Sequence, residues 1–138
     1  MPEETRVLEK SYLVTDEVAI HFMGPGVPTV LSTPSLLMWM ELTSRENVSQ
    51  LLGAGEDTVG ISIEMQHLAA TPVGMRVRVV SRLVGVEGRI YTFDLEAFDA
   101  FDKIAEARHQ RASVPVAKFA SRVESKQQKV HSQSGEPR

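Results

Sequence analysis

The stretch Ser32–Gly53, STPSLLMWMELTSRENVSQLLG, decides how this chain folds, because it predicts one long helix with a clear start and a clear end. Thr33 can cap the free N–H groups of the first turn, Pro34 suits the first helical position, and Gly53 suits the residue after the helix. The first two turns are almost wholly apolar, which favours a helix enclosed by other structure. Glu41 is the one charged residue in that run, so it is the first candidate for chemistry.

Composition and length describe an ordinary globular chain of 138 residues, with 42% apolar and 24% charged residues. Residues 1–120 predict a single domain, and the polar residues 121–138 predict a frayed or disordered tail. A net charge of −3 gives no reason to expect nucleic acid or a membrane as a partner. The chain has no cysteine, which excludes disulfides and thiolate sites. The first ten residues lack the layout of a secretory signal, and we therefore expect a cytoplasmic protein.

Extended runs surround the helix on both sides. Residues 5–15 and 18–22 predict short strands, and the Gly- and Pro-rich residues 23–28 predict a loop before the helix. Four further β-type runs follow the helix with short breaks, at residues 58–68, 75–84, 90–101 and 104–116. One long helix wrapped by a curved antiparallel sheet is an α+β hotdog fold. By strict alternation, one face of the first of these runs carries Val59, Ile61, Ile63, Met65 and His67.

Three residues combine polar chemistry with apolar surroundings, and each has two interpretations. His67 is either a core histidine bonded to a backbone carbonyl or a general base, since imidazole titrates near neutral pH. Glu41 is either a surface carboxylate paired with an arginine or a catalytic group. Thr33 is either a simple helix cap or a residue beside an oxyanion at the positive end of the helix.

The side of the last strand that is expected to face the helix adds two candidates, His109 and Arg111, which are either a solvated strand end or an anion site at the mouth of a pocket. Gly60 interrupts a strand pattern, which indicates a bulge or a close backbone approach. His21 is expected on the surface. Four scattered histidines without clustered carboxylates do not form a ligand set, so we expect no metal site and no cofactor.

The motif His-x-Ala-Ala-Thr-Pro-x-Gly at residues 67–74 resembles that of the hotdog thioesterases similar to fluoroacetyl-CoA thioesterase. The resemblance spans roughly residues 5 to 126. It implies that Thr33, Glu41 and His67 are the catalytic set, that Gly60 offers a backbone N–H near the thioester oxygen, and that Arg111 lines the site. The loop at residues 23–28 lacks the phenylalanines of the lid in the fluoroacetyl enzyme. The resemblance therefore implies thioester chemistry without fluoroacetyl selectivity.

The predicted activity is hydrolysis of an acyl-CoA thioester to a free acid and CoA. Attack by water and attack by Glu41 through an anhydride both remain open. Two alternatives use the same fold: an enoyl-thioester hydratase, which also needs a histidine and a carboxylate, and an acyl-CoA binding module without turnover.

The spacing of Thr33 and Glu41 predicts assembly. Eight helical residues at about 1.5 Å each place them roughly 12 Å apart, too far for a direct hydrogen bond. Either a bend in the helix shortens this distance, or Thr33 of one subunit meets Glu41 of another, as in a two-fold homodimer with two composite sites. Hotdog domains generally pair side by side, so the resemblance implies the same arrangement, with the sites at the subunit interface.

Overall fold

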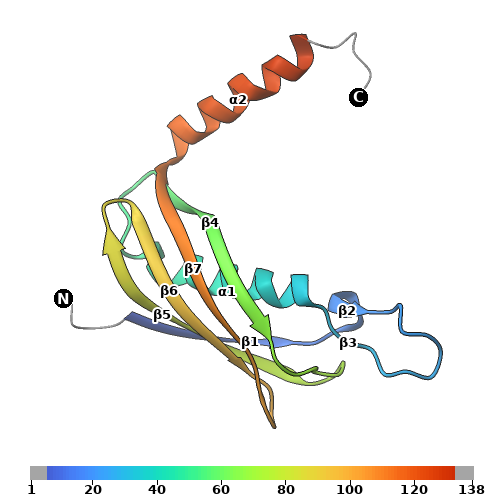
Figure 1. Cartoon of the computed structure of the whole chain (residues 1–138). Coiled ribbons are helices and arrows are strands. Elements are labelled where there is room, and N and C mark those ends of the chain that lie inside the picture. Colours follow the sequence, from blue (N-terminus) through green and yellow to red (C-terminus); the bar gives the residue numbers. More distant parts are fainter. Residues whose placement is uncertain (1–5, 133–138) are drawn as a thin grey trace.

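The computed structural model describes residues 6–132, and its main feature is a curved five-stranded sheet lying against helix α1 (Figure 1). The strand order is β1-β5-β6-β7-β4, and every neighbouring pair is antiparallel. The predicted hotdog architecture is therefore confirmed, although Thr5, where the first strand was expected to begin, lies outside the described residues. The elements are β1 (Arg6–Leu13), a 3-10 turn (Asp16–Val18), β2 (Ala19–Ile20), β3 (Val30–Leu31), α1 (Thr33–Ser49), β4 (Glu56–His67), β5 (Arg76–Glu87), β6 (Ile90–Phe98), β7 (Lys103–Pro115) and α2 (Val116–Ser132).

The start of α1 differs from the prediction by one residue. Ser32, and not Thr33, is the cap: its hydroxyl accepts a hydrogen bond of 3.2 Å from the backbone N–H of Ser35. Thr33 is the first helical residue, so its own hydroxyl is free for another partner. The helix also ends earlier than expected, at Ser49, and a turn carries the chain on to Gly53.

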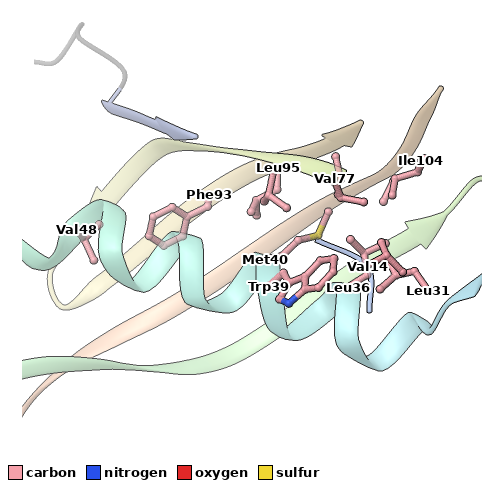
Figure 2. Packing of buried hydrophobic residues seen from close by; sticks show 13 residues of the cluster. Val14, Leu31, Leu36, Trp39, Met40, Val48, Val77, Phe93, Leu95 and Ile104 are labelled. Atoms are coloured by element: carbon pink, nitrogen blue, oxygen red, sulfur yellow. The ribbon is translucent and has the colours of Figure 1, made fainter. Parts of the chain in front are cut away.

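The hydrophobic core lies between α1 and the concave face of the sheet (Figure 2). Leu36, Met40 and Val48 on the helix are fully buried against side chains such as Phe93 and Leu95 of β6. Burying a side chain of this size stabilises the fold by about 1.5–3 kcal/mol. The helix is not enclosed on all sides, however. Two apolar residues on α1 remain exposed in the single chain, Met38 and Leu42.

A β-bulge in β4 breaks the alternation that the sequence predicted. The register of β4 against β7 shifts between Gly60 and Ser62. Ile61, expected on the helix-facing side, is 51% exposed, because the extra residue reverses the faces on the two sides of the bulge. Before the bulge Thr58 and Gly60 face inward, and after it His67 does.

The C-terminal region corrects another expectation. Residues 121–132, predicted to be frayed or disordered, form most of α2, which extends away from the sheet (Figure 1). None of its residues is buried. Residues 133–138 of the predicted tail lie outside the described part. Neither of the helices between residues 6 and 132 is long and apolar enough to cross a membrane.

Candidate active site

One group of site residues lies at the start of α1. His67, the last residue of β4, faces the helix as predicted, and its Nδ1 lies 2.8 Å from the Thr33 hydroxyl oxygen. The bond is possible because Ser32 has taken over the capping of the helix. Two residues that are 34 positions apart in sequence thus form one hydrogen-bonded pair.

The protonation state of His67 and the surroundings of its second nitrogen determine what the imidazole can do chemically. Burial lowers the pKa of His67 below its ordinary value, with the backbone of Ala69 offsetting part of the effect, so the imidazole is neutral at pH 7. Its Nε2 is shielded from solvent and has no hydrogen-bond partner within residues 6–132. If Nδ1–H donates to Thr33, Nε2 keeps a free lone pair and can act as a base. In the other tautomer Nε2 carries the proton and can act as an acid.

A pocket of about 600 Å³ opens beside this pair, and both Thr33 and His67 line it. Most of the other lining side chains are apolar, among them Ile20, Leu31 and Phe22. Phe22 is 79% exposed at the rim. This aromatic residue was not predicted to lie at the site, because Phe22 directly precedes residues 23–28, the only residues expected to form the loop before the helix.

A second group lies further along α1, around Glu41. The Nη1 atom of Arg111 is 3.7 Å from Glu41 Oε2, which makes an ion pair. Gly60 lies against the same carboxylate: a Cβ built on Gly60 would collide with Glu41 Oε2. Gly60 does not have a positive φ, so the position needs glycine for space and not for backbone conformation. The close backbone approach expected at Gly60 is therefore present.

Arg111 and His109 are buried, at 5% and 0% exposure, which overturns the alternative of a solvated strand end. Arg111 Nε donates to the Thr58 hydroxyl at 2.7 Å, and Nη2 donates to the Thr58 carbonyl at 2.9 Å. Burial lowers the pKa of Arg111, while the charge of Glu41 raises it. The guanidinium is thus a buried, well-anchored cation beside a carboxylate.

The single chain does not bring the two groups together. Thr33 and Glu41 are eight helical residues apart, which is roughly 12 Å. Gly60 and His67 are seven residues apart on β4, which is about 20 Å at strand spacing. No hydrogen bond or ion pair joins Glu41 to Thr33 or His67 in the part of the chain that the structure describes.

The remaining candidates play no part in either group. His21 bonds to the Asp16 carbonyl at 3.0 Å on the surface, as predicted. Between residues 6 and 132, no set of three or more His, Cys, Asp or Glu side chains is arranged to hold a metal ion.

Comparison with known proteins identifies the class. Residues 14–117 match the family described as fluoroacetyl-CoA-specific thioesterase. The chain is 34% identical to the fluoroacetyl-CoA thioesterase of Streptantibioticus cattleyicolor over 99 residues, which cover 72% of this chain and 71% of that protein.

Solved structures agree. The fluoroacetyl-CoA thioesterase FlK superposes with a TM-score of 0.80 at 28% identity, covering 87% of this chain and 93% of that one. A thioesterase superfamily member from Thermus thermophilus gives 0.81 at 30% identity, covering 94% of both chains. Fold and relatives together define a hotdog-fold thioester hydrolase. The chain belongs to the family of fluoroacetyl-CoA-specific thioesterases.

Proposed function

We propose that this protein hydrolyses an acyl-CoA thioester to a free acid and CoA. In this proposal Thr33, Glu41 and His67 carry the catalysis, and Gly60 and Arg111 bind the substrate. The observation that carries it is the Thr33–His67 pair. Its imidazole Nε2 has no hydrogen-bond partner among residues 6–132, and both residues line an apolar pocket. The relative from Streptantibioticus cattleyicolor, by its name, acts on a CoA thioester.

The chemistry follows from what each group offers. A neutral His67 can take a proton from water or return one to the leaving thiolate, and Thr33 fixes the orientation of the ring. Backbone N–H groups at the start of α1 or near Gly60 can stabilise the oxyanion that forms on the thioester carbonyl. Glu41 either orients the attacking water or attacks the carbonyl itself, and both routes remain part of the proposal.

We further propose that the complete site forms between two copies of the chain. β4 is an edge strand of 12 residues, and such an edge can pair with another chain. With the bulge between Gly60 and Ser62 taken into account, an antiparallel β4–β4 pairing centred on Glu64 would put His67 of one subunit opposite Gly60 of the other. The two groups of site residues, separated within one chain, would then meet across the two-fold axis.

Exposed apolar surface supports the same assembly. Ile61 on the edge strand and Met38 and Leu42 on the helix are all exposed in the single chain. Burial of Met38 and Leu42 against a second subunit would complete the core around α1, whose first turns are too apolar for one sheet to cover, and Ile61 would be covered at the paired edge.

Complementation between two inactive variants tests the composite site. A His67→Ala subunit and a Glu41→Ala subunit, unfolded and refolded together, form a heterodimer with one intact site and one doubly altered site. Half of the dimers in an equal mixture are heterodimers, so about a quarter of wild-type activity should return. Each variant refolded alone is the matched control. No recovery from verified heterodimers, or a monomeric mass in solution, contradicts the proposal.

A thiol-release assay on short, medium, branched and aromatic acyl-CoAs tests the activity itself. Release of CoA supports hydrolysis. Hydration of an enoyl-CoA without thiol release would indicate a hydratase, and binding without turnover would indicate a binding module. Location in the cytoplasm stays a prediction.

A further inference from the structure

Hydrogen bonds to two residues, Thr58 and His109, hold the Arg111 guanidinium. Arginine has five N–H donors and no acceptor. Two of them bond the hydroxyl and the carbonyl of Thr58, and one on Nη1 bonds His109 Nε2 at 3.1 Å. One further N–H remains on Nη1, the atom that lies 3.7 Å from Glu41 Oε2. Thr58 and His109 together thus leave the guanidinium one orientation.

The hydrogen bonds of His109 determine its tautomer. Because arginine can only donate, His109 Nε2 must accept the bond from Arg111 and carries no proton. Nδ1 must then carry the proton, and it lies 2.7 Å from the carbonyl oxygen of Ser62, to which it donates. His109 also stacks on Phe93, with ring centroids 5.9 Å apart. Neither nitrogen is left for catalysis, so His109 acts on its neighbours.

The bulge in β4 makes this arrangement possible. On β7 His109 and Arg111 are two positions apart, with one residue between them, whereas on β4 their partners Ile63 and Gly60 are three positions apart, with two residues between them. The extra residue places Gly60 opposite Arg111, where its missing side chain leaves room for Glu41. The same distortion includes Ser62, whose carbonyl accepts from His109.

We propose that His109 and Thr58 are positioning residues: they fix the Arg111 guanidinium so that its remaining Nη1–H faces the Glu41 carboxylate. The inference rests on the proposed role of Glu41 in thioester hydrolysis. It assigns to His109 no contact with substrate and no proton transfer. Loss of the acceptor at Nε2 lets the guanidinium rotate, and the carboxylate loses its fixed position. Small displacements of reacting groups cost up to about a hundredfold in rate.

A double-mutant cycle tests whether His109 acts through Arg111. His109→Leu should lower kcat about ten- to a hundredfold with little change in KM. His109→Gln keeps an acceptor near the Nε2 position and should recover a large part of that loss. Combined with Arg111→Met, His109→Leu should cost no more than about twofold beyond Arg111→Met alone. If the two losses multiply instead, His109 does not act through Arg111 and the inference is overturned.

Two controls separate positioning from stability. Gln110→Ala alters the residue between His109 and Arg111, whose side chain bonds Thr92 on the other face of the sheet, and should leave kcat within about twofold. If His109→Leu does not fold, Thr58→Val replaces it in the same cycle. Thr58→Ser, which keeps the hydroxyl, is then the conservative partner and should retain most of kcat.

A measurement without turnover decides the geometry. The imidazole ¹⁵N spectrum of the wild-type protein at pH 7.5 should show His109 as the neutral Nδ1–H tautomer. An imidazolium or an Nε2–H tautomer overturns the inference even if the enzyme is active. If the wild-type protein releases no thiol from any acyl-CoA, the proposed function fails, and the tautomer decides the Arg111 arrangement by itself.

Discussion

The two groups of site residues differ in how completely one chain satisfies them. Around Arg111, a buried guanidinium, a buried imidazole and a glycine without room for a side chain hold Glu41 in place. At the start of α1, Thr33 is exposed and His67 Nε2 has no partner between residues 6 and 132. We call the residues around Arg111 the closed group, or closed half of the site, because their polar atoms are paired within one chain. We call Thr33 and His67 the open group, or open half, because a polar atom of His67 is left without a partner in the described residues.

This difference shows which part of the site is already formed when a single chain folds. The closed group is fixed by a bulge, a strand register and buried hydrogen bonds, all of which form within one chain. The open group offers a nitrogen that only substrate, water or a second subunit can satisfy, since buried polar atoms rarely stay unpaired. The open group is therefore where we expect the substrate carbonyl and the partner subunit to arrive.

Removing one ionisable group from each half should have the largest effect. We expect His67→Ala and Glu41→Ala each to lower turnover by at least about a hundredfold, because each loses a proton-transfer or nucleophilic group. Steady-state kinetics with the best acyl-CoA measures the loss, and circular dichroism confirms that the fold survives. Near-wild-type turnover in both variants would show that these residues have a structural role and no catalytic one.

Filling the space at Gly60 should disturb the closed half of the site without removing a polar group from it. Gly60→Ala puts a methyl group where the Glu41 carboxylate lies, so the carboxylate must move, and we expect kcat to fall about tenfold or more. Gly85→Ala is the matched control, because a Cβ there meets only the Thr92 Cβ at 3.9 Å. Equal kinetics for the two variants would show that the fit of Glu41 against Gly60 is irrelevant to turnover.

The pH dependence of kcat/KM should report the titration of His67 in the open half of the site. His67 must be neutral to accept a proton, and burial lowers its pKa, so the acidic limb of kcat/KM should be centred below pH 6.5. His109→Gln should keep this acidic limb, since the pKa of His109 is also lowered by burial but its nitrogens are already bonded. A limb centred above 6.5, or one that disappears in His109→Gln, would assign the titration to another group.

Most of the fold could be predicted from the sequence because its signals are local. The apolar helix and the alternating strands fixed the architecture, and the inward face of β7 was placed correctly through His109 and Arg111. The bulge could not be placed, since it depends on how two strands distant in sequence pair. Gly60 was its only local signal.

The site was predicted as a set of residues but not as an arrangement. Ser32 rather than Thr33 caps α1, and these neighbours are both good capping residues, so sequence alone could not choose between them. That choice frees the Thr33 hydroxyl to bond His67. The role of Thr58 had no sequence signal, because a threonine in a strand is ordinary.

The acyl selectivity of the open half should show the smallest effect. Residues 23–28 contain no aromatic side chain that could close over a small acyl group, so we expect only a weak preference for fluoroacetyl-CoA over acetyl-CoA and tolerance of larger acyl groups. Phe22 nevertheless lines the pocket beside Thr33 and His67. Because 79% of its surface is exposed, it buries little apolar surface in this position. Phe22→Ala should therefore change kcat/KM for acetyl-CoA by less than about tenfold, which is under about 1.4 kcal/mol and thus at the low end of the 1–3 kcal/mol that one methylene contributes in a hydrophobic pocket. Phe101→Ala, an equally exposed phenylalanine in the turn between β6 and β7, is the control and should have no effect. Comparing kcat/KM for both thioesters in the three proteins decides the point. Strong fluoroacetyl selectivity that disappears in Phe22→Ala would show that this one aromatic residue replaces the lid.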